Sequence, residues 1–302
     1  MRKRFRIWLA LLPVAALAGL AWLLLGPREP DPLYRGRPLT YWLQGFSPGQ
    51  WPATKGPARP SEDEAQEAVQ HFGTNAIPTL LRLLRTPDSP FRRRAFELIE
   101  RQHFVRISHI PPMQLYMEIV RGFGELGAEA RPAVAQLCQI YDQHSSEVSR
   151  QIIPQLMADI GPSARDTIPL LVRGTTDPDP YVRNNSLYAL RRIGGEPALV
   201  VPALIKCLTD PIDYVRAKAA DALAAFGTNA QPAVPELLKL LAREPANPSV
   251  VGSAYSETFT TAWGLHPTGA GRPRVGSLEV SGAVTAALKA IDPETAAKAG
   301  VK

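Results

Sequence analysis

The chain has very little of what metal, redox and thiol chemistry need, since its 302 residues include only two cysteines and five histidines. Neither cysteine stands in a Cys-x-x-Cys spacing, and no histidine directly precedes a glutamate. Metal sites draw on such closely spaced ligands, so the ligand set for a metal is missing and we expect no cofactor.

Outside the first few residues, the chain also has almost no excess of positive over negative charge. The formal net charge is +6, but four of the 34 basic residues stand at the amino end, Arg2, Lys3, Arg4 and Arg6. Without them, 34 − 4 = 30 basic residues face 28 acidic ones. Nucleic-acid binding needs many clustered lysines and arginines, so a nearly neutral body argues against a nucleic-acid partner.

Two short motifs have the form of catalytic or nucleotide-binding loops but lack their context. Residues 45–49 read Gly-Phe-Ser-Pro-Gly, yet Pro48 has no N–H for an oxyanion hole and no strand precedes the serine. Residues 122–127 read Gly-Phe-Gly-Glu-Leu-Gly, but a helical pattern stands where a dinucleotide site needs a strand. We therefore expect no catalytic residues and no enzymatic activity.

An uncharged apolar run occupies residues 7–25, after the basic segment 1–6. It is just long enough to cross a bilayer of about 30 Å as a helix. Basic residues before such a run remain in the cytoplasm, which predicts a single-pass inner-membrane protein of bacterial type with residues after 26 on the extracytoplasmic side. The alternative is a secreted protein, because Ala16-Leu-Ala18 fits the cleavage site of a signal peptide.

Residues 26–60 are rich in proline and predict an extended spacer that holds the globular part away from the membrane. Within this spacer, residues 34–46 predict one short helix with Trp42, Leu43 and Phe46 on one face. Two interpretations stay open for this helix: a lid packed on the first repeat, or a docking peptide for another protein.

A fixed period dominates the rest of the chain. Gly161, Gly194 and Gly227 are 33 residues apart, and Asp177–Arg183 returns at the same step as Asp210–Arg216. A period in this range is typical of a solenoid, in which each unit buries its apolar face against its neighbours. We expect an all-α solenoid of about six helical repeats, preceded by one transmembrane helix.

The pattern of each repeat predicts two helices. We expect the repeat glycine to end the second helix and to adopt a left-handed conformation. The first helices are expected at 77–85, 130–141, 164–173, 197–208 and 231–243. The second helices are expected at 91–102, 113–125, 147–160, 180–193, 213–226 and 278–291. The solenoid then spans 61–245, an insert follows at 246–277, and 278–302 supplies the final helix and a cap.

The Gly-x-x-Ala…Pro-x-Leu-Leu turn and the Asp-Pro…Val-Arg…Ala-Leu…Gly helix resemble HEAT repeats of the bilin-lyase-like, armadillo-type kind. The resemblance implies a right-handed solenoid. It also implies that arginines matching Arg183 and Arg216 bridge to aspartates at the repeat turns, here Asp177, Asp179, Asp210 and Asp213. Deoxyhypusine hydroxylase shares the repeat but holds iron on His-Glu motifs, which this chain lacks.

Repeat alignment places both cysteines at positions of core leucines, Cys138 with Leu238 and Cys207 with Leu240. They lie two repeats apart, or about 20 Å at roughly 10 Å per helix layer. That separation is too large for a disulfide. We expect two buried free thiols.

The insert at 246–277 breaks the period and carries Tyr255, Phe259, Trp263 and His266. It is too aromatic for a simple flexible linker. Two interpretations stay open: a loop that contacts a partner or ligand, and a cap that packs on the last repeat.

Together these features predict a membrane-anchored, non-catalytic scaffold that binds a protein along the concave face formed by the second helices. The alternative is an enzyme of the same fold, lyase-like or metal-dependent and oxidoreductase-like, acting on a small ligand or a protein. A third interpretation is a structural envelope protein whose repeats stack on copies of themselves. The sequence leaves the partner and the oligomeric state open. The candidate partner-binding residues are Asn184, Tyr188, Arg191, Lys218, Tyr255, Phe259 and Trp263.

Overall fold

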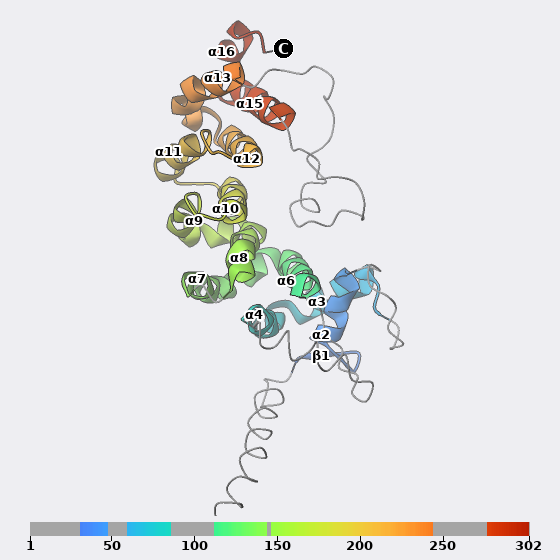
Figure 1. The fold of residues 1–302 in the computed structure, drawn as a ribbon. Helices are drawn as coiled ribbons and strands as arrows, with labels where there is room; N and C mark the ends of the chain where they lie inside the picture. Colours follow the sequence, from blue (N-terminus) through green and yellow to red (C-terminus); the bar gives the residue numbers. More distant parts are fainter. Residues whose placement is uncertain (1–30, 48–58, 86–111, 144–145, 244–276, 302) are drawn as a thin grey trace, which may run out of the picture.

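The computed structural model describes residues 31–47, 59–85, 112–143, 146–243 and 277–301. These residues are mostly helical and form an elongated stack of helix pairs (Figure 1). The described part of the chain therefore has the all-α, repeated architecture that the period predicts.

Helices alternate along the stack in the predicted order. The first helices of the repeats are α4 (Ile77–Leu84), α7 (Val134–Asp142), α9 (Ile168–Gly174), α11 (Pro197–Cys207) and α13 (Val234–Arg243). The second helices are α3 (Glu62–Phe72), α6 (Pro112–Leu126), α8 (Glu147–Ile160), α10 (Pro180–Ile193), α12 (Asp213–Ala224) and α15 (Ser277–Ile291). The spans of α8 and α10 are those predicted.

The two kinds of helix form two rows. Helices α7, α9, α11 and α13 lie on one side of the stack, and α8, α10, α12 and α15 on the other (Figure 1). The stack bends towards the row of second helices, which therefore lines its inner side. Buried alanines on α12, such as Ala219 and Ala220, let its neighbours α10 and α15 pack closely.

Local signals set the helix starts. Ser61 and Glu64 form the predicted capping box at α3, with Glu64 N donating to Ser61 Oγ at 3.2 Å and Ser61 N to Glu64 Oε2 at 2.8 Å. Asp179 caps α10 and is followed by Pro180 at the first helical position. Both arrangements satisfy amide groups that a helix start leaves without intrahelical acceptors.

The repeat glycines differ from the prediction in one respect. Gly161 and Gly194 have positive φ angles, +70° and +66°, but their ψ angles are −146° and −178° rather than the +47° of a left-handed helix. This region is accessible to glycine almost alone. A 3₁₀ segment begins at Gly127, Gly161 and Gly227, so α7, α9 and α13 begin a few residues later than predicted.

Residues 31–47 contain a short helix, as predicted for 34–46, but a hairpin that the sequence did not predict precedes it. Strands β1 (Leu33–Tyr34) and β2 (Arg37–Pro38) make a hairpin, followed by α2 (Leu39–Trp42) and a 3₁₀ turn at Leu43–Phe46. Leu39, Trp42, Leu43 and Phe46 are buried, and this segment packs on α3 and α6. It therefore seals the apolar end of the first repeat, which is the lid interpretation.

The opposite end of the stack closes with α16 (Pro293–Lys298), which packs on α15. Asp292 caps α16 through Thr295 N at 3.0 Å and also accepts from Gln231 Nε2 at 2.8 Å. These hydrogen bonds hold the pKa of Asp292 down at about 2, the bond from the Thr295 backbone N–H contributing most. The carboxylate thus joins the last helix to the turn before α13.

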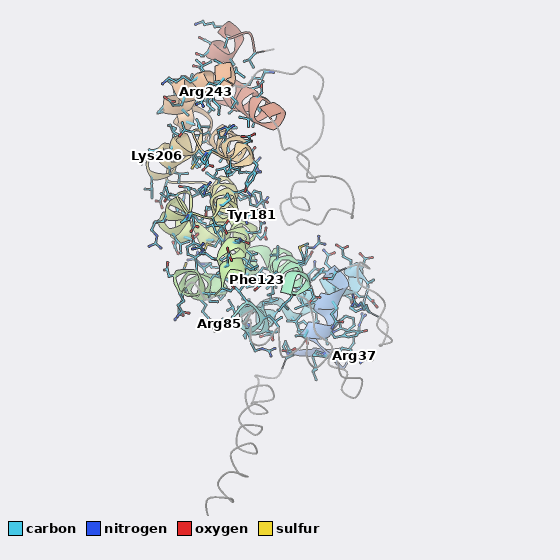
Figure 2. The ribbon with its side chains drawn as sticks, in the orientation of Figure 1. Arg37, Arg85, Phe123, Tyr181, Lys206 and Arg243 are labelled. Carbon is cyan, nitrogen blue, oxygen red and sulfur yellow. The ribbon has the colours of Figure 1, made fainter. Side chains whose placement is uncertain are left out.

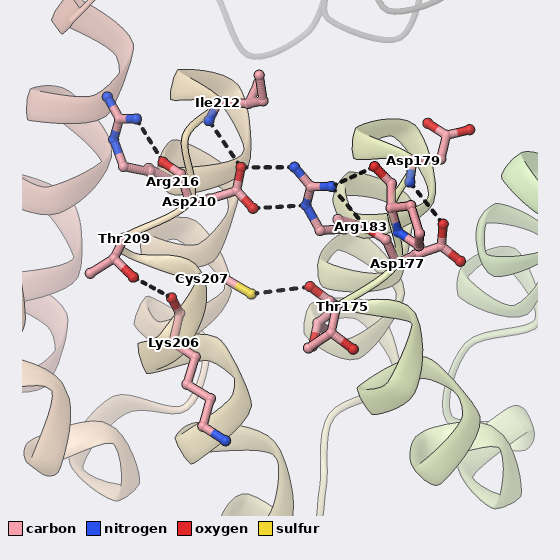
Figure 3. Close-up of polar contacts among 12 residues, drawn as sticks. Thr175, Asp177, Asp179, Arg183, Lys206, Cys207, Thr209, Asp210, Ile212 and Arg216 are labelled. Atoms are coloured by element: carbon pink, nitrogen blue, oxygen red, sulfur yellow. Dashed lines mark hydrogen bonds and ion pairs between the residues drawn. The ribbon is translucent and has the colours of Figure 1, made fainter.

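An arginine–aspartate ladder joins successive repeats. Arg183 binds Asp210 of the next repeat through two bonds, Nε to Oδ2 at 2.7 Å and Nη2 to Oδ1 at 3.0 Å (Figure 3). Its Nη1 also donates to the Asp177 carbonyl of its own turn at 2.8 Å. Arg150 reaches Asp177 in the same forward direction at 3.4 Å, a step that the sequence reading missed.

Arg216 is the equivalent of Arg183 in the next repeat. The position that follows Asp177 and Asp210 in the period is Arg243, so no aspartate stands there. Arg216 instead binds Asp213 within its own helix at 2.7 Å and the Asp210 carbonyl at 2.8 Å. These contacts confirm the predicted structural role of the charges, and among the described residues Arg150–Asp177 and Arg183–Asp210 join one repeat to the next.

Several predictions lie outside the described residues: the apolar run 7–25, the helix at 91–102 and most of the insert 246–277. Among the residues that the structure describes, no helix is long and apolar enough to cross a membrane.

Candidate functional site

Three of the residues predicted from the sequence meet on the inner side of the stack. Tyr188 and Arg191 lie on α10, and Lys218 lies on α12 of the next repeat. The Lys218 Nζ lies 5.7 Å from the Tyr188 ring centroid, within the range of a cation–π contact. Arg191 Nε and Lys218 Nζ both approach Asp221 Oδ2, at 3.3 and 3.7 Å.

Asn184, the fourth predicted residue on these helices, has a bracing role. Its Nδ2 donates to Asn185 Oδ1 at 3.1 Å, and Asn185 Nδ2 donates to the Gln151 carbonyl of α8 at 2.9 Å. Asn184 is half-buried, so only part of its side chain faces solvent. Asn185 thus holds α10 against α8, and Asn184 braces Asn185.

The sequence reading missed two tyrosines beside this cluster. Tyr181 and Tyr214 stand at equivalent positions of α10 and α12, and their rings stack with centroids 6.3 Å apart. Tyr181 is 39% exposed and projects from the inner side of the stack (Figure 2). Their 33-residue spacing was visible in the Asp…Tyr-Val-Arg repeat, where we treated the tyrosine as a landmark of the fold.

We call this group the α10–α12 surface. Its members share exposure, full or partial, on the inner side of two adjacent repeats, and they are Tyr181, Asn184, Tyr188, Arg191, Tyr214, Lys218 and Asp221. Burial raises the pKa of Tyr214 to about 12, so its phenol keeps its proton at physiological pH. The surface therefore offers aromatic rings and hydroxyls next to two cations that share one carboxylate.

A half-buried carboxylate lies one helix away, on α8. Burial raises the pKa of Asp159 to about 6, while the hydrogen bond from Gln155 Nε2 at 3.1 Å and the charge of Arg192 act in the opposite direction. Glycosidases and aspartic proteases pair such a carboxyl group with a second one held close to it. Asp159 is held by an amide instead, an arrangement that fits a structural role.

The structure gives no metal-binding arrangement in its described part, where no three histidine, cysteine or acidic side chains converge.

A shallow groove of about 350 Å³ lies between α11 and α13, with Leu208 and Leu240 in its wall. Its charged residues Glu236 and Lys239 bind each other at 2.7 Å. Their pairing is that of an ordinary solvated helix surface.

The two thiols differ in their surroundings. Cys207 is buried, and its Sγ donates to the Thr175 carbonyl at 3.6 Å (Figure 3). Burial raises its pKa to about 11, so it is a poor nucleophile. Cys138 is only half-buried, so the prediction of a buried core thiol holds for Cys207 and is wrong for Cys138. The Cys138 side chain on α7 is partly exposed, whereas Cys207 is the last residue of α11 and contacts Thr175 of the preceding repeat.

The remaining candidates, Tyr255, Phe259 and Trp263, lie outside the described residues. The structure thus brings together three predicted residues and adds Tyr181, Tyr214 and Asp221 to them.

Comparison with known proteins bears on the repeat. Residues 200–230 match the family model of the HEAT repeat. No curated protein matches the chain. A crystal structure of an engineered protein aligns with 14% identity over 82% of this chain and 97% of that chain, with a TM-score of 0.34. The matched segment contains most of α11, all of α12 and the turn after it, so this part of the chain is similar to a HEAT repeat.

Proposed function

We propose that this chain is a non-catalytic scaffold that binds a protein partner along the α10–α12 surface. HEAT repeats generally mediate protein–protein interactions, and the family match falls on α12 and its neighbours. The observation that carries the proposal is the juxtaposition of the Tyr181–Tyr214 stack with the Tyr188, Arg191, Lys218 and Asp221 cluster on successive repeats.

The residue types support a protein partner. Tyrosine and arginine dominate the energetics of protein interfaces because they bury a large area and still offer hydrogen bonds. The Arg191 side chain is 40% exposed beside Asp221. A carboxylate on the partner can bind this exposed guanidinium, so we expect the bound segment to present at least one acidic side chain.

The second part of the proposal is a membrane anchor. The apolar run 7–25 and the basic residues before it support a single span with the repeats on the extracytoplasmic side. Resistance to alkaline extraction and protection from protease in spheroplasts would test both points. A mature protein that begins after Ala18 in a soluble extracytoplasmic fraction would favour the secreted alternative.

Site-specific photocrosslinking tests the binding surface. Benzoylphenylalanine replaces Tyr181 or Tyr214 in the full chain, and Leu199 on α11 serves as the control because it is 42% exposed in the other row of helices. We expect one discrete protein adduct from positions 181 and 214, and none from 199.

A charge reversal makes the test specific. Arg191→Glu should abolish the adduct at position 181, because it places a second acid beside Asp221 and repels an acidic partner. An adduct that is equally strong from position 199, or one that Arg191→Glu leaves unchanged, would contradict the proposal.

A further inference from the structure

The hairpin at the amino end of the stack carries an unusual tip. Its two-residue turn consists of Arg35 and Gly36, with φ angles of +48° and +71°. Leu33 is 67% exposed, and Arg35 in the turn and Arg37 directly after it are also exposed. Arg37 marks this corner of the molecule, far from Tyr181 and Arg243 (Figure 2).

The turn holds a cation where glycine, asparagine or aspartate is usual. Two positive φ angles define a type I′ turn, whose first central position disfavours long side chains. Arg35 nevertheless occupies it, with its guanidinium 4.9 Å from the Tyr34 ring centroid and Nη2 bonded to Glu67 Oε1 at 2.8 Å. A strained residue that the fold retains often has a role beyond folding.

The hairpin also has a fixed position relative to the apolar run. Asp31 is bound by Arg82 and by Thr79 Oγ1 of α4, which ties the residue before the hairpin to the first repeat. Leu25 ends the apolar run six residues earlier. A chain of six residues spans at most about 22 Å even when fully extended. The hairpin therefore lies close to the membrane surface whenever the run 7–25 spans a bilayer.

We propose that the hairpin tip, Leu33, Arg35 and Arg37, docks on anionic lipid headgroups and fixes the amino end of the solenoid against the membrane. The proposal rests on the membrane anchor of the proposed function. An exposed leucine enters the interfacial region while arginines bind the headgroup phosphates. Tyr34, beside the turn, and Tyr41, on α2, are of a residue type that favours this interface.

The two arginines should contribute unequally. Glu67 is bound to Arg35 and offsets its charge. Arg37 lies over the Tyr41 ring at 5.1 Å and supplies the net positive charge of the tip. Loss of Arg37 should therefore weaken docking more than loss of Arg35, and Glu67→Gln should strengthen docking by releasing the charge of Arg35.

The full chain in lipid nanodiscs provides the test. In a Cys138→Ser background, Leu33→Cys carries the environment-sensitive fluorophore NBD, while the buried thiol of Cys207 stays unlabelled. Lys298→Cys on α16, at the far end of the stack, is the control position. We expect brighter, blue-shifted emission at position 33 in discs containing phosphatidylglycerol than in discs of phosphatidylcholine, and equal emission at position 298.

The charge variants sharpen this result. Arg37→Gln should lower the ratio of docked to undocked hairpin about fivefold, whereas Lys298→Gln, which removes an equal charge elsewhere, should have no effect. Glu67→Gln should raise that ratio. Equal emission at position 33 in both lipids would overturn the docking inference and leave the anchor intact. Failure of the full chain to incorporate into discs would overturn the anchor and the inference with it.

Discussion

The middle of the stack and its amino end are stabilised by different means. From α8 to α12, an arginine–aspartate contact recurs between repeats, and each second helix packs against the second helix of the next repeat. At the amino end, a hairpin and a short helix with no counterpart elsewhere in the described stack cover α3 and α6. The comparison shows that the adjacent repeat covers the apolar face of an inner repeat, whereas a non-repeated segment covers the apolar face of the first one.

The two regions should also differ in how far a destabilising substitution lowers stability along the stack. A repeat array behaves approximately as a chain of units coupled to nearest neighbours. A defect in the terminal segment should remain at that end, whereas a defect in the middle interrupts the coupling between two halves. The following predictions test this difference, in order of expected effect.

Trp42→Ala should cause the largest loss, confined to the amino end. Trp42 is buried, its Nε1 donates to the Tyr34 carbonyl at 3.2 Å, and its ring packs on Tyr34. Removing such a side chain costs about 4 kcal/mol. Hydrogen exchange should rise across the hairpin and α3 but not in α10 and α12. Leu33→Ala is the control, and equal loss of protection along the whole stack would contradict local behaviour.

Arg183→Ala should cost about 3 kcal/mol in the free energy of unfolding, because it leaves the buried Asp210 without its cation. The side chains of Arg183 and Asp210 are only 12% and 8% exposed. Arg173→Ala is the matched control, since Arg173 binds Asp142 at 3.0 Å with both side chains largely exposed. That control should lose less than about 1 kcal/mol. Urea denaturation followed by circular dichroism would measure both, and equal losses would contradict the structural role of the ladder.

Asp159→Asn should stabilise the protein in a pH-dependent way. The pKa of Asp159 rises from 3.8 to about 6 in the folded protein, so folding favours its protonated form. The contribution of this carboxyl group to stability is therefore complete below about pH 4 and is lost as the pH rises to about 6. The variant should be more stable by about 2 kcal/mol at pH 7.5 and nearly unchanged at pH 4. Thermal unfolding at both pH values would show this difference, and destabilisation at pH 7.5 would mean that the charged form is the stabilising one.

Gly124→Ala should give the smallest change, a gain of about 0.7 kcal/mol. Gly124 lies exposed inside α6, and an added Cβ would meet no atom within 4 Å. Gly161→Ala is the contrasting variant, because Gly161 has a φ angle of +70° and alanine there should destabilise. Changes of opposite sign in the free energy of unfolding, measured by urea denaturation, would support the distinction between helical and turn glycines. A loss of stability with Gly124→Ala would contradict it.

The periodic part of this fold is readable from the sequence because each landmark acts locally. Asp179 and Pro180 start α10 and Gly194 ends it, so its bounds follow from three residues. The direction of the ladder does not follow from them. Whether Arg183 binds an aspartate in its own turn or the next depends on the distance between stacked repeats, which no local pattern encodes.

The non-periodic parts were harder to predict for the same reason. The hairpin strands have two residues each, too short for an alternating pattern, and the Arg35-Gly36 turn lacks the usual asparagine. The candidate surface was half predicted: Tyr188, Arg191 and Lys218 followed from helical register. Tyr181 and Tyr214 did not, because a tyrosine that recurs with the repeat resembles a packing residue until its exposure is known.

The forward reach of the ladder has a consequence for how such a chain can grow. Arg183 binds an acid 27 residues ahead, and the acids themselves recur every 33 residues. A duplication of residues 178–210 would carry one such arginine and one such aspartate, and both junctions would find their partners unchanged. The stack could thus lengthen by in-frame gene duplication without the invention of a new interface. Its length would then be a trait that selection can adjust in whole units.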